Sequence, residues 1–452
     1  MEANKVKHTL KILLAFYGDD FTGSTDALEF ITRAGAKAVL FTETPTAEQL
    51  AAIPGLNVYG VAGKTRSLSP AEMEKILMPA FEQMKAMGAR HVHYKVCSTF
   101  DSSATVGSIG KAIDCGATVF KNEFTPVLGG MPALGRYCLF GNLFAKMGIG
   151  SDGAIYRLDR HPSMSIHPVT PATESDLTKL LGGQTAKKTG LIDILKVSGS
   201  RGDINQAVEK LLAEETSVLI YDALKNEDLV SFASHLDAIA TGYKMTLFSV
   251  GSSGIEMGLG THWMRNGLMS PVKEWAPVTK AEPLLVVSGS CSPVTAAQIE
   301  YAKANGFEEI ILDAVKICDD DTLDGNQLAE IVDKLQQKKN LIVHTGSKQA
   351  QNLSSEKLGT ALGNIAKNAV IKAAVKRILV AGGDTSSYAA RAMEIDAVEM
   401  LAPLVTGAPL CKVHSRNEAM HGLEVNFKGG QVGGKEYFLM VVNGGRPSAS
   451  SG

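Results

Sequence analysis

The sequence predicts an α/β protein of two domains, each a mainly parallel sheet flanked by helices, with a cleft between the domains. Short apolar runs alternate with helical patterns along most of the chain, which is typical of parallel sheets covered by helices. The 452 residues also exceed what one hydrophobic core usually serves. A loop-like stretch containing Pro271, Pro277 and Pro283 interrupts the alternation. We therefore expect the two domains to span residues 1–275 and 276–452.

The apolar runs of the first domain each end in polar loop residues and lead into a helical pattern. After the first run this pattern continues through Ala27, Leu28 and Ile31. The expected strands of the first domain are 11–17, 38–41, 57–61, 91–96, 118–120, 217–222 and 246–250. The expected strands of the second domain are 283–287, 310–312, 340–344 and 377–381.

Composition and charge argue against several classes of protein. The chain has 45 Lys and Arg against 47 Asp and Glu, a net charge of −2, and it lacks the basic run that a nucleic-acid-binding protein needs. It contains no apolar run long enough to span a membrane and no signal-peptide cleavage pattern. Its six cysteines are far apart without a C-x-x-C pair, which argues against structural zinc and disulfide scaffolds. We therefore expect a cytoplasmic protein without a nucleic-acid or membrane partner.

Three glycine-rich loops in the second domain, at 287–293, 381–387 and 427–434, indicate a nucleotide site. Glycine lets a backbone approach a phosphate closely, and the exposed N–H groups of such loops are donors. One loop alone has a purely steric explanation, but three favour phosphate binding. The Walker A motif is absent. Asp384 is a candidate for Mg²⁺, for a ribose hydroxyl or for a helix cap.

An acidic loop follows the first strand and carries Asp19, Asp20 and Thr22, with Asp26 further along. Adjacent carboxylates at the carboxyl end of a strand bind polyols or take a proton from a hydroxyl. The alternative is an Asp that caps the next helix beside a hydrated neighbour.

Cations follow two other strands of the first domain. Lys64 and Arg66 come after the strand at 57–61, and Lys95 begins a polar cluster that follows strand residues 91–94. We expect these cations to converge near the acidic loop, where they would bind a substrate carboxylate or transferred phosphoryl charge. The alternative is a structural ion-pair network. Hydroxyl groups that could bond to sugar hydroxyls follow Lys95, at Ser98, Thr99 and Ser102, and Asp101 of the same stretch is a further expected substrate contact.

The segment 157–171 contains two His-Pro steps and a Thr-Pro step, which favour a long ordered loop over a helix. Arg160, His161 and His167 lie in this loop and are candidates for contact with an anion. A lone histidine, however, usually has a structural role.

Six stretches in this order carry the motifs of a known family: 18–26, 95–102, 167–171, 288–290, 382–385 and 428–434. They resemble the motifs of the four-carbon acid sugar kinases, which include kinases of threonate, erythronate, 3-oxo-tetronate and 3-oxo-isoapionate. The resemblance implies an N-terminal sugar-acid domain and a C-terminal nucleotide domain, with ATP phosphates near Ser288, Gly382 to Thr385 and Gly430. Cys97 stands where the threonate branch has an acid, so the chain looks closer to the 3-oxo acid kinases.

We therefore expect a phosphotransferase that uses ATP and Mg²⁺ to phosphorylate a hydroxyl of a four- or five-carbon sugar acid, a 3-oxo-tetronate or 3-oxo-isoapionate. Asp20 or Asp19 would deprotonate that hydroxyl, with Lys95 as a third catalytic residue, and Arg66, Lys95 or the histidine loop would hold the carboxylate. The other expected substrate-binding residues are Thr22, Asp26, Lys64, Ser98, Thr99, Asp101, Arg160, His161 and His167. The expected nucleotide-binding residues are Ser288, Gly289, Ser290, Gly382, Gly383, Asp384, Thr385, Lys428, Gly429, Gly430 and Gly433.

Three alternatives remain at this point: a threonate or erythronate kinase, an NAD-dependent sugar-acid dehydrogenase and a periplasmic-type sugar-binding protein. The dehydrogenase would need a G-x-G-x-x-G fingerprint after its first strand, and the binding protein would need an export signal. The sequence has neither pattern. It leaves the metal ligands unassigned and is compatible with a homo-oligomer.

Overall fold

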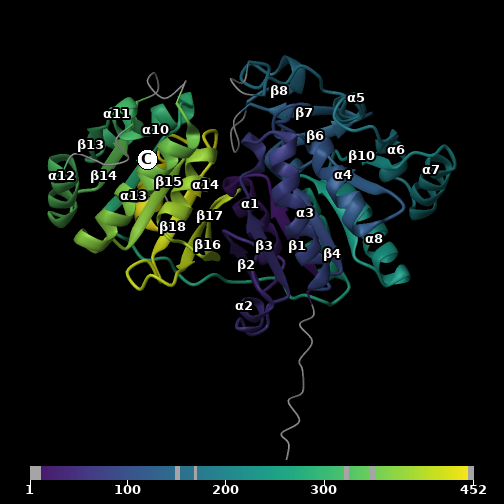
Figure 1. The fold of residues 1–452 in the computed structure, drawn as a ribbon, viewed down its shortest axis with the longest axis horizontal. Helices are drawn as coiled ribbons and strands as arrows, with labels where there is room; N and C mark the ends of the chain where they lie inside the picture. Colours follow the sequence, from purple (N-terminus) through teal and green to yellow (C-terminus); the bar gives the residue numbers. More distant parts are fainter. Residues whose placement is uncertain (1–11, 148–152, 167–169, 320–324, 347–352, 446–452) are drawn as a thin grey trace, which may run out of the picture.

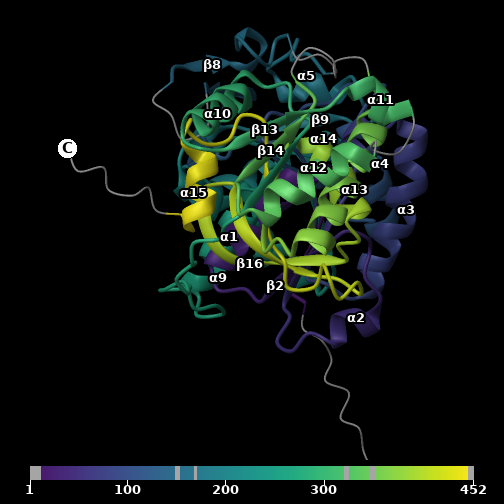
Figure 2. The same ribbon diagram turned by 90° about the vertical axis from the view of Figure 1, so that its left-hand side faces the viewer.

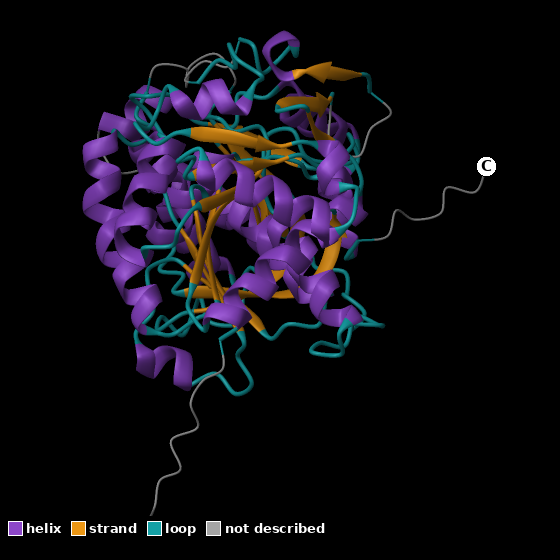
Figure 3. Ribbon diagram, turned by 90° about the vertical axis from the view of Figure 1, so that its right-hand side faces the viewer, coloured by secondary structure: helices purple, strands orange, loops and turns teal. Residues whose placement is uncertain are grey.

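The computed structural model describes residues 12–147, 153–166, 170–319, 325–346 and 353–445. The chain is an α/β protein with helices on both faces of its strands (Figures 1 and 3). Each half contains a mainly parallel sheet, as expected, but the two sheets join into one sheet of 15 strands. The expectation of two separate sheets was therefore wrong. The cleft between the halves and the boundary near residue 275 stay predictions.

The first half forms eight neighbouring strands that all run parallel. Gly18, at the end of the first strand, aligns with Ala62 on one neighbour and with Lys95 on the other. The loops that follow these three strands therefore begin at the same edge of the sheet. In sheet order the strands are β2 (Ala38–Phe41), β3 (Val58–Ala62), β1 (Leu14–Gly18), β4 (His91–Lys95), β11 (Leu247–Gly251), β5 (Thr125–Leu128), β10 (Val218–Tyr221) and β9 (Thr189–Ile192).

Alternate side chains of β1 enter the two cores of this half. Leu14 and Phe16 pack with α1, α8 and α9, whereas Ala15 and Tyr17 pack with α3 and α4 on the other face. This alternation follows from the two-residue repeat of a strand that is buried on both sides. The helices of this half are α1 (Phe21–Arg33), α2 (Ala47–Ala51), α3 (Pro70–Ala86), α4 (Ile109–Phe120), α5 (Leu177–Gly182), α6 (Ile194–Val197), α7 (Arg201–Ala213), α8 (Asn226–Tyr243) and α9 (Gly254–Arg265).

One expected strand of the first half was wrong. Residues 118–120 form the last turn of α4, and the strand comes later, as β5. Val119 and Phe120 are buried, and they continue the apolar face that Ile109 and Ile113 begin. A short apolar run looks the same at the end of a buried helix as in a buried strand, so periodicity over three residues could not separate the two.

A small antiparallel sheet is inserted between β5 and α5, and it lies at the top of the first half in Figure 1. It consists of β6 (Arg136–Leu139), β7 (Asn142–Lys146) and β8 (Ile155–Arg157). Cys138 pairs with Ala223, just past the end of β10, so the insert lies at the carboxyl edge of the large sheet. The short 3₁₀ helices η1 (Thr65–Ser67), η2 (Pro132–Leu134) and η3 (Leu158–Arg160) also belong to this half.

The second half has five parallel strands followed by an antiparallel hairpin. In sheet order these are β13 (Glu308–Ile311), β14 (Leu341–His344), β12 (Leu284–Ser288), β15 (Arg377–Ala381), β18 (Glu424–Lys428), β17 (Ala408–His414) and β16 (Ala397–Val405). Helices α10 (Pro293–Ala304) and α15 (Tyr437–Asn443) cover one face. On the other face, in front in Figure 2, lie α11 (Ala314–Asp319), α12 (Gly325–Gln336), α13 (Ser355–Ala373) and α14 (Gly383–Ala392).

The two halves meet where β16 pairs with β2 in antiparallel register, Ala397 opposite Phe41. Arg391 of α14 crosses the same junction and donates to the carbonyl oxygens of Thr42, at 2.6 Å, and Ala62, at 2.8 Å. These contacts join the carboxyl ends of β2 and β3 to the second half. In the described part of the chain, no helix has both the length and the apolar character to cross a membrane.

Candidate active site

The candidate active site lies where the carboxyl ends of two sets of strands meet. β3, β1 and β4 are neighbours in the first half, and β12, β15 and β18 are neighbours in the second half. Helix α1 connects the two sets, because Phe21 N–H donates to Ser387 Oγ of α14 at 3.1 Å and the Phe21 ring lies 4.2 Å from that of Phe427. Ligands of open α/β sheets bind at this kind of edge.

Asp20 is both a helix cap and one partner of an ion pair. It caps α1 by accepting from Gly23 N–H at 2.9 Å. Its other oxygen accepts from Thr22 Oγ1 at 2.7 Å and lies 2.9 Å from Arg66 Nη2. Burial opposes ionisation of this carboxyl, but Arg66 and Lys95 outweigh burial and hold its pKa below the usual value. Asp20 is therefore ionised, and both of its oxygens have partners.

Asp19 is buried like Asp20 but has fewer partners. Its Oδ2 accepts from Cys97 N–H at 3.3 Å, whereas Oδ1 has no hydrogen-bond partner among the described residues. Burial and the neighbouring charge of Asp20 raise the pKa of Asp19 to about 7. The two adjacent carboxylates thus differ: Asp20 is a fixed anion, and Asp19 can take up or release a proton near neutral pH.

Lys95 is fully buried beside Asp26. Its Nζ donates to Val96 O at 2.8 Å and lies 3.9 Å from Asp26 Oδ2. Burial works against the charge of Lys95, but Asp26 and Asp19 more than compensate and raise its pKa. The same Asp26 oxygen accepts from Ser253 Oγ at 2.6 Å, while burial raises the pKa of Asp26 to about 7. Sequence reasoning missed Ser253, although it follows β11, the neighbour of β4.

Arg66 lies between the two halves. Besides its pair with Asp20, its Nη2 lies 3.4 Å from Asp384 Oδ1 on α14. Lys64 also faces the second half, with Nζ 5.7 Å from the ring centroid of Tyr388. The expected convergence of cations on the acidic loop therefore holds for Arg66 and Lys95, and both cations already have carboxylate partners. These contacts fit the alternative of a structural ion-pair network.

The polar residues after Lys95 lie next to the acidic loop. Cys97 donates its backbone N–H to Asp19, and its Sγ lies 3.0 Å from Thr99 Oγ1. Burial raises the pKa of the Cys97 thiol to about 12, so this group is a neutral thiol. Ser98 and Thr99 are buried, and Asp101 Oδ1 is a buried atom without a hydrogen-bond partner among the described residues.

The histidine loop contributes less than expected. His161 is buried, and its Nδ1 accepts from the N–H groups of Ser163 at 3.2 Å and Met164 at 3.3 Å, so these bonds stay within its own loop. Arg160 is exposed on η3. His167 lies outside the described residues. The structure thus gives His161 a structural role in the inserted sheet.

Sequence reasoning also missed Arg136, the first residue of β6. Its side chain is buried, and burial lowers the pKa of Arg136, while Cys97, Asp101, Asp26 and Tyr137 act in the opposite direction. The inserted sheet therefore brings a further cation to the acidic edge. No spacing pattern indicated it, because Arg136 lies in an insertion and follows no strand of the large sheet.

The glycine loops of the second half converge on each other and on the acidic edge. A Cβ at Gly289 would lie 2.5 Å from Thr385 Oγ1, and one at Gly430 would lie 3.0 Å from Ser292 Cβ. A Cβ at Gly383 would lie 2.7 Å from Arg66 Nη2 and 3.1 Å from Asp20 Oδ2. Gly383 is therefore the residue at which the glycine loops contact the acidic cluster. Of the other predicted residues in these loops, Ser288 ends the buried strand β12, and Gly382 follows β15 and caps α14. A Cβ at Gly430 would lie 3.2 Å from Ser290 Oγ, and one at Gly429 would lie 3.9 Å from Thr22 Oγ1. Gly433 has a positive φ.

Lys428 is a buried cation beside the glycine loops of the second half. Its Nζ donates to Thr295 Oγ1 at 3.0 Å and to Gly429 O at 2.9 Å. Among the ion pairs of the described residues, none includes Lys428. Burial lowers its pKa to about 7. A cation that is held only by neutral groups beside glycine loops can gain from binding an anion.

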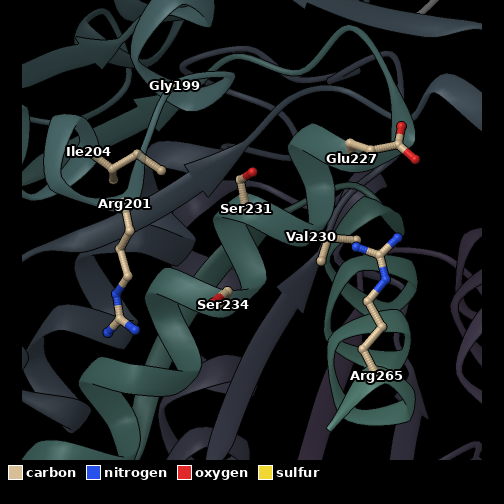
Figure 4. A pocket seen from close by; sticks show the side chains of 8 residues that line it. All are labelled: Gly199, Arg201, Ile204, Glu227, Val230, Ser231, Ser234 and Arg265. Atoms are coloured by element: carbon tan, nitrogen blue, oxygen red, sulfur yellow. The ribbon is translucent and has the colours of Figure 1, made fainter.

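A pocket of about 280 Å³ lies elsewhere, on the outside of the first half beside α7, α8 and α9 (Figure 4). It includes none of the predicted site residues. Its lining residues are Gly199, Arg201, Ile204, Glu227, Val230, Ser231, Ser234 and Arg265.

Comparison with known proteins agrees with the division of the site. The model of a sugar-binding N-terminal domain matches residues 14–259, which include the acidic edge. The model of a nucleotide-binding C-terminal domain matches residues 285–438, which include the glycine loops. Two solved proteins share the fold: one from Salmonella typhimurium LT2, with a TM-score of 0.73 and 24% identity, and one from Haemophilus influenzae, with a TM-score of 0.68 and 22% identity. Each match covers 94% of this chain and 98% of the solved chain.

Two curated relatives match nearly the whole chain. The chain is 40% identical to a 3-oxo-isoapionate kinase of Paraburkholderia graminis, over 96% of this chain and 94% of the relative. It is 27% identical to a 3-oxo-tetronate kinase of Pseudomonas savastanoi pv. phaseolicola, over 95% of this chain and 96% of the relative. The resemblance found in the sequence motifs is thereby confirmed, and the chain belongs to the four-carbon acid sugar kinase family.

Proposed function

We propose that this chain is an ATP-dependent kinase that phosphorylates a hydroxyl of a small 3-oxo sugar acid, with 3-oxo-isoapionate as the first candidate and 3-oxo-tetronate as the second. The relative at 40% identity supports this choice of substrate class. The observation that carries the proposal is the meeting of the two edges at Gly383. At Gly383, the glycine loop that leads into α14 lies within contact distance of Arg66 and Asp20.

Asp19 is the better candidate for the general base. Asp20 caps α1 and pairs with Arg66, so both of its oxygens are engaged, whereas Asp19 Oδ1 has no hydrogen-bond partner in the described part of the chain. A base whose pKa lies near 7 is matched to neutral pH. In the proposed step the substrate hydroxyl oxygen attacks the γ-phosphorus of ATP, the bond to the ADP oxygen breaks, and the hydroxyl proton goes to Asp19 Oδ1.

Arg66 and Lys95 supply positive charge on the sugar side. Asp20 positions Arg66 at 2.9 Å, and Arg66 faces the start of α14, where phosphoryl charge would develop. Lys95 lies deeper in the protein, where it helps to lower the pKa of Asp20 and so favours the ionised carboxylate. In this proposal Arg66 stabilises the negative charge that develops in the transition state. Lys95 adjusts the pKa values of the acidic residues.

The second half offers donors for the ATP phosphates. Helix α14 begins at Gly383, and the N–H groups and dipole at a helix N-terminus favour anions. Ser288 ends β12 and is followed by Gly289 and Ser290, and Lys428 ends β18 and is followed by a loop that contains Gly430. Both strands are neighbours of β15, which α14 follows. Approach of phosphate oxygens would give Lys428 the anionic partner that the described ion pairs lack and would favour its protonated form.

Asp20 and Asp384 suit a Mg²⁺ ion that binds to protein carboxylates and to the phosphates of ATP at the same time. Asp20 and Asp384 both reach Arg66 Nη2, at 2.9 and 3.4 Å, so their oxygens lie near each other. Mg²⁺ commonly binds one or two carboxylates together with phosphates and waters. The described residues contain no group of three or more His, Cys, Asp or Glu side chains that could hold a metal ion, so a site made of protein ligands alone does not fit there. When bound, Mg²⁺ would neutralise charge on the ATP phosphates.

A screen of sugar acids tests the proposal. ADP formation would be measured with 3-oxo-isoapionate, 3-oxo-tetronates, threonate and erythronate, and mass spectrometry would confirm an added phosphate on the acid. We expect the highest kcat/KM with a 3-oxo acid. A preference for threonate or erythronate would show that the chain belongs to the threonate branch of the family instead. Hydride transfer to NAD without ADP formation would reject the kinase. A cytoplasmic location and a homo-oligomer stay predictions.

A further inference from the structure

The buried cations of the described residues differ in what balances their charge. Arg377 pairs with Glu424, and Lys95 lies beside Asp26. Lys428 faces the glycine loops, where ATP phosphates are proposed to bind. Arg136 has no ion-pair partner among the described residues, although its side chain is only 7% exposed. A buried guanidinium without a carboxylate is costly, so its presence calls for an explanation.

Neutral groups of the inserted sheet hold Arg136 in place. Its Nη1 donates to Leu134 O at 2.7 Å and to Lys146 O at 3.4 Å, while the start of β6 pairs with the end of β7. Its Nε is buried and has no hydrogen-bond partner among the described residues. The guanidinium is thus fixed by one nitrogen and keeps another donor unused.

Arg136 belongs to the acidic edge rather than to the outer surface. Cys97, Asp101 and Asp26 are the first three groups that act against the lowering of the pKa of Arg136 by burial, and Tyr137 is the fourth. On the side of the inserted sheet, burial lowers the pKa of His161, and Arg136 in turn helps to lower it. Leu134, whose carbonyl oxygen accepts from Arg136, and Asp26 both lie near Gly407: a Cβ placed at Gly407 would lie 3.7 Å from Leu134 Cδ2 and 3.8 Å from Asp26 Oδ1. The inserted sheet therefore brings Arg136 to the Asp26 and Asp101 part of the acidic cluster.

The unused polar atoms of this cluster form a pattern. Asp19 Oδ1, Asp26 Oδ1 and Asp101 Oδ1 are buried acceptors without partners among the described residues, and Arg136 Nε is a buried donor without one. Buried polar atoms in proteins are nearly always paired, so unpaired atoms near one another indicate a missing ligand. A sugar acid supplies the complement, because its hydroxyls donate and its carboxylate accepts.

We infer that Arg136 binds the carboxylate of the sugar acid, while Asp26 and Asp101 accept hydrogen bonds from its hydroxyls. This inference rests on the proposed function and sharpens it. It replaces Arg66, Lys95 and His161 as expected carboxylate ligands, because Arg66 and Lys95 already have carboxylate partners and His161 is bonded within its own loop. The inserted sheet thereby selects acids over neutral sugars.

Calorimetry on the full chain tests this assignment, with 3-oxo-isoapionate, 3-oxo-tetronates and threonate as probes and ADP as the second ligand. We expect Arg136→Met to weaken binding of the preferred acid by about 100-fold, because a buried charged contact is lost. Arg136→Lys should weaken it by roughly 10-fold, since lysine keeps the charge but not the bidentate geometry. ADP affinity should stay within about twofold, because Arg136 lies in the first half.

Arg157→Met is the matched control. Arg157 lies on β8 of the same inserted sheet and pairs with Asp159, and we expect it to leave acid binding unchanged. A second readout is the preference of the wild-type chain for the acid over its amide, which Arg136→Met should abolish.

The outcomes separate this inference from the proposed function. Unchanged acid binding in Arg136→Met would overturn the inference even if the wild-type chain is a kinase. Selective loss of acid binding in the variant, with no phosphate transfer by the wild-type chain, would reject the kinase and keep the inference. If the wild-type chain binds none of the acids, both fail. If Arg136→Met does not fold, as judged by loss of ADP binding, Arg136→Lys decides.

Discussion

The two carboxyl edges that meet at Gly383 have opposite chemistry. The edge of the first half carries Asp19, Asp20 and Asp26 with cations among them, so most charges are balanced within the protein. The edge of the second half consists of glycine and serine loops around one buried cation, Lys428. The first edge suits a ligand that brings hydroxyls and gives up a proton. The second suits a ligand that brings negative charge.

The two edges also differ in the direction in which burial shifts the pKa values of their charged residues. On the acidic edge, burial raises the pKa of Asp19 and Asp26 to about 7, while on the glycine edge burial lowers the pKa of Lys428 to about 7. Loss of solvation disfavours the charged form in each case, which moves acids and bases in opposite directions. Both edges therefore hold groups whose charge a ligand can change near neutral pH.

The largest expected effect comes from Asp19→Asn, which would remove the proposed base. We expect kcat to fall by about 10³-fold, while the affinities for ADP and for the acid change little. In the wild-type chain kcat should rise with pH through about 7, because the base acts in its deprotonated form. Steady-state kinetics from pH 5.5 to 8.5 measure both effects.

Asp193→Asn is the control for Asp19→Asn, since Asp193 caps α6 away from the site. If Asp19→Asn kept normal turnover while Asp26→Asn lost it, the base would be Asp26, and the two edges would meet differently from our proposal.

Gly383→Val tests the contact between the edges. The new side chain would meet Arg66 and Asp20, so it would displace Arg66 and block the approach of phosphate. We expect kcat/KM to fall by about 10²-fold, since small displacements at reacting groups have effects of that size. Gly325→Val is the control, because a Cβ at Gly325 has no neighbour within 4 Å. Equal activity of the two variants would place the nucleotide elsewhere.

Lys428→Met tests the proposed phosphate ligand of the glycine edge. We expect ADP affinity to fall by roughly 30-fold, the size of a hydrogen bond to a charged group, with acid affinity unchanged. Lys435→Met, at an exposed lysine near Tyr301, should have no such effect. Loss of acid binding instead of ADP binding would contradict this assignment, because it would place the acid at the edge of the second half.

The same variant has a stability signature without ligand. The pKa of Lys428 is about 7 in the folded chain and 10.5 in the unfolded chain, so the buried lysine destabilises the fold at neutral pH. Between pH 7 and about 10 the unfolded chain holds the proton that the folded chain has released. The free energy of unfolding of the wild-type chain should therefore rise with pH relative to Lys428→Met, as denaturant titrations at pH 6.5 and 9.5 would show.

The smallest expected effect is the coupling between Arg66 and Asp384 across the two halves. Their contact measures 3.4 Å, and the Asp384 side chain is 40% exposed, so solvent screens it. A double-mutant cycle with Arg66→Met and Asp384→Asn should give a coupling of about 0.5 kcal/mol in unfolding free energy. A coupling near zero without ligand but large with bound ADP would indicate that the pair acts only in the closed complex.

Part of the site could be predicted because each loop follows a recognisable strand. Asp19 follows β1, Lys95 ends β4 and Arg66 lies in the connection after β3, and parallel strands bring their carboxyl ends to one edge. The glycine loops were found for the same reason. Residues 118–120 were misassigned because three apolar residues do not distinguish a helix end from a strand. The fusion of two sheets was missed because β16 and β2, which pair there, lie more than 350 residues apart.

Local patterns and ordered motifs were enough to predict the fold class, the family and the residues that stand at the ends of strands. Which of these residues are free to act depends on the folded chain. Asp20 is engaged, Asp19 Oδ1 has no hydrogen-bond partner among the described residues, and an inserted sheet supplies Arg136. The physical reason is that pairing and protonation depend on burial and on neighbours from distant segments, which no local pattern records.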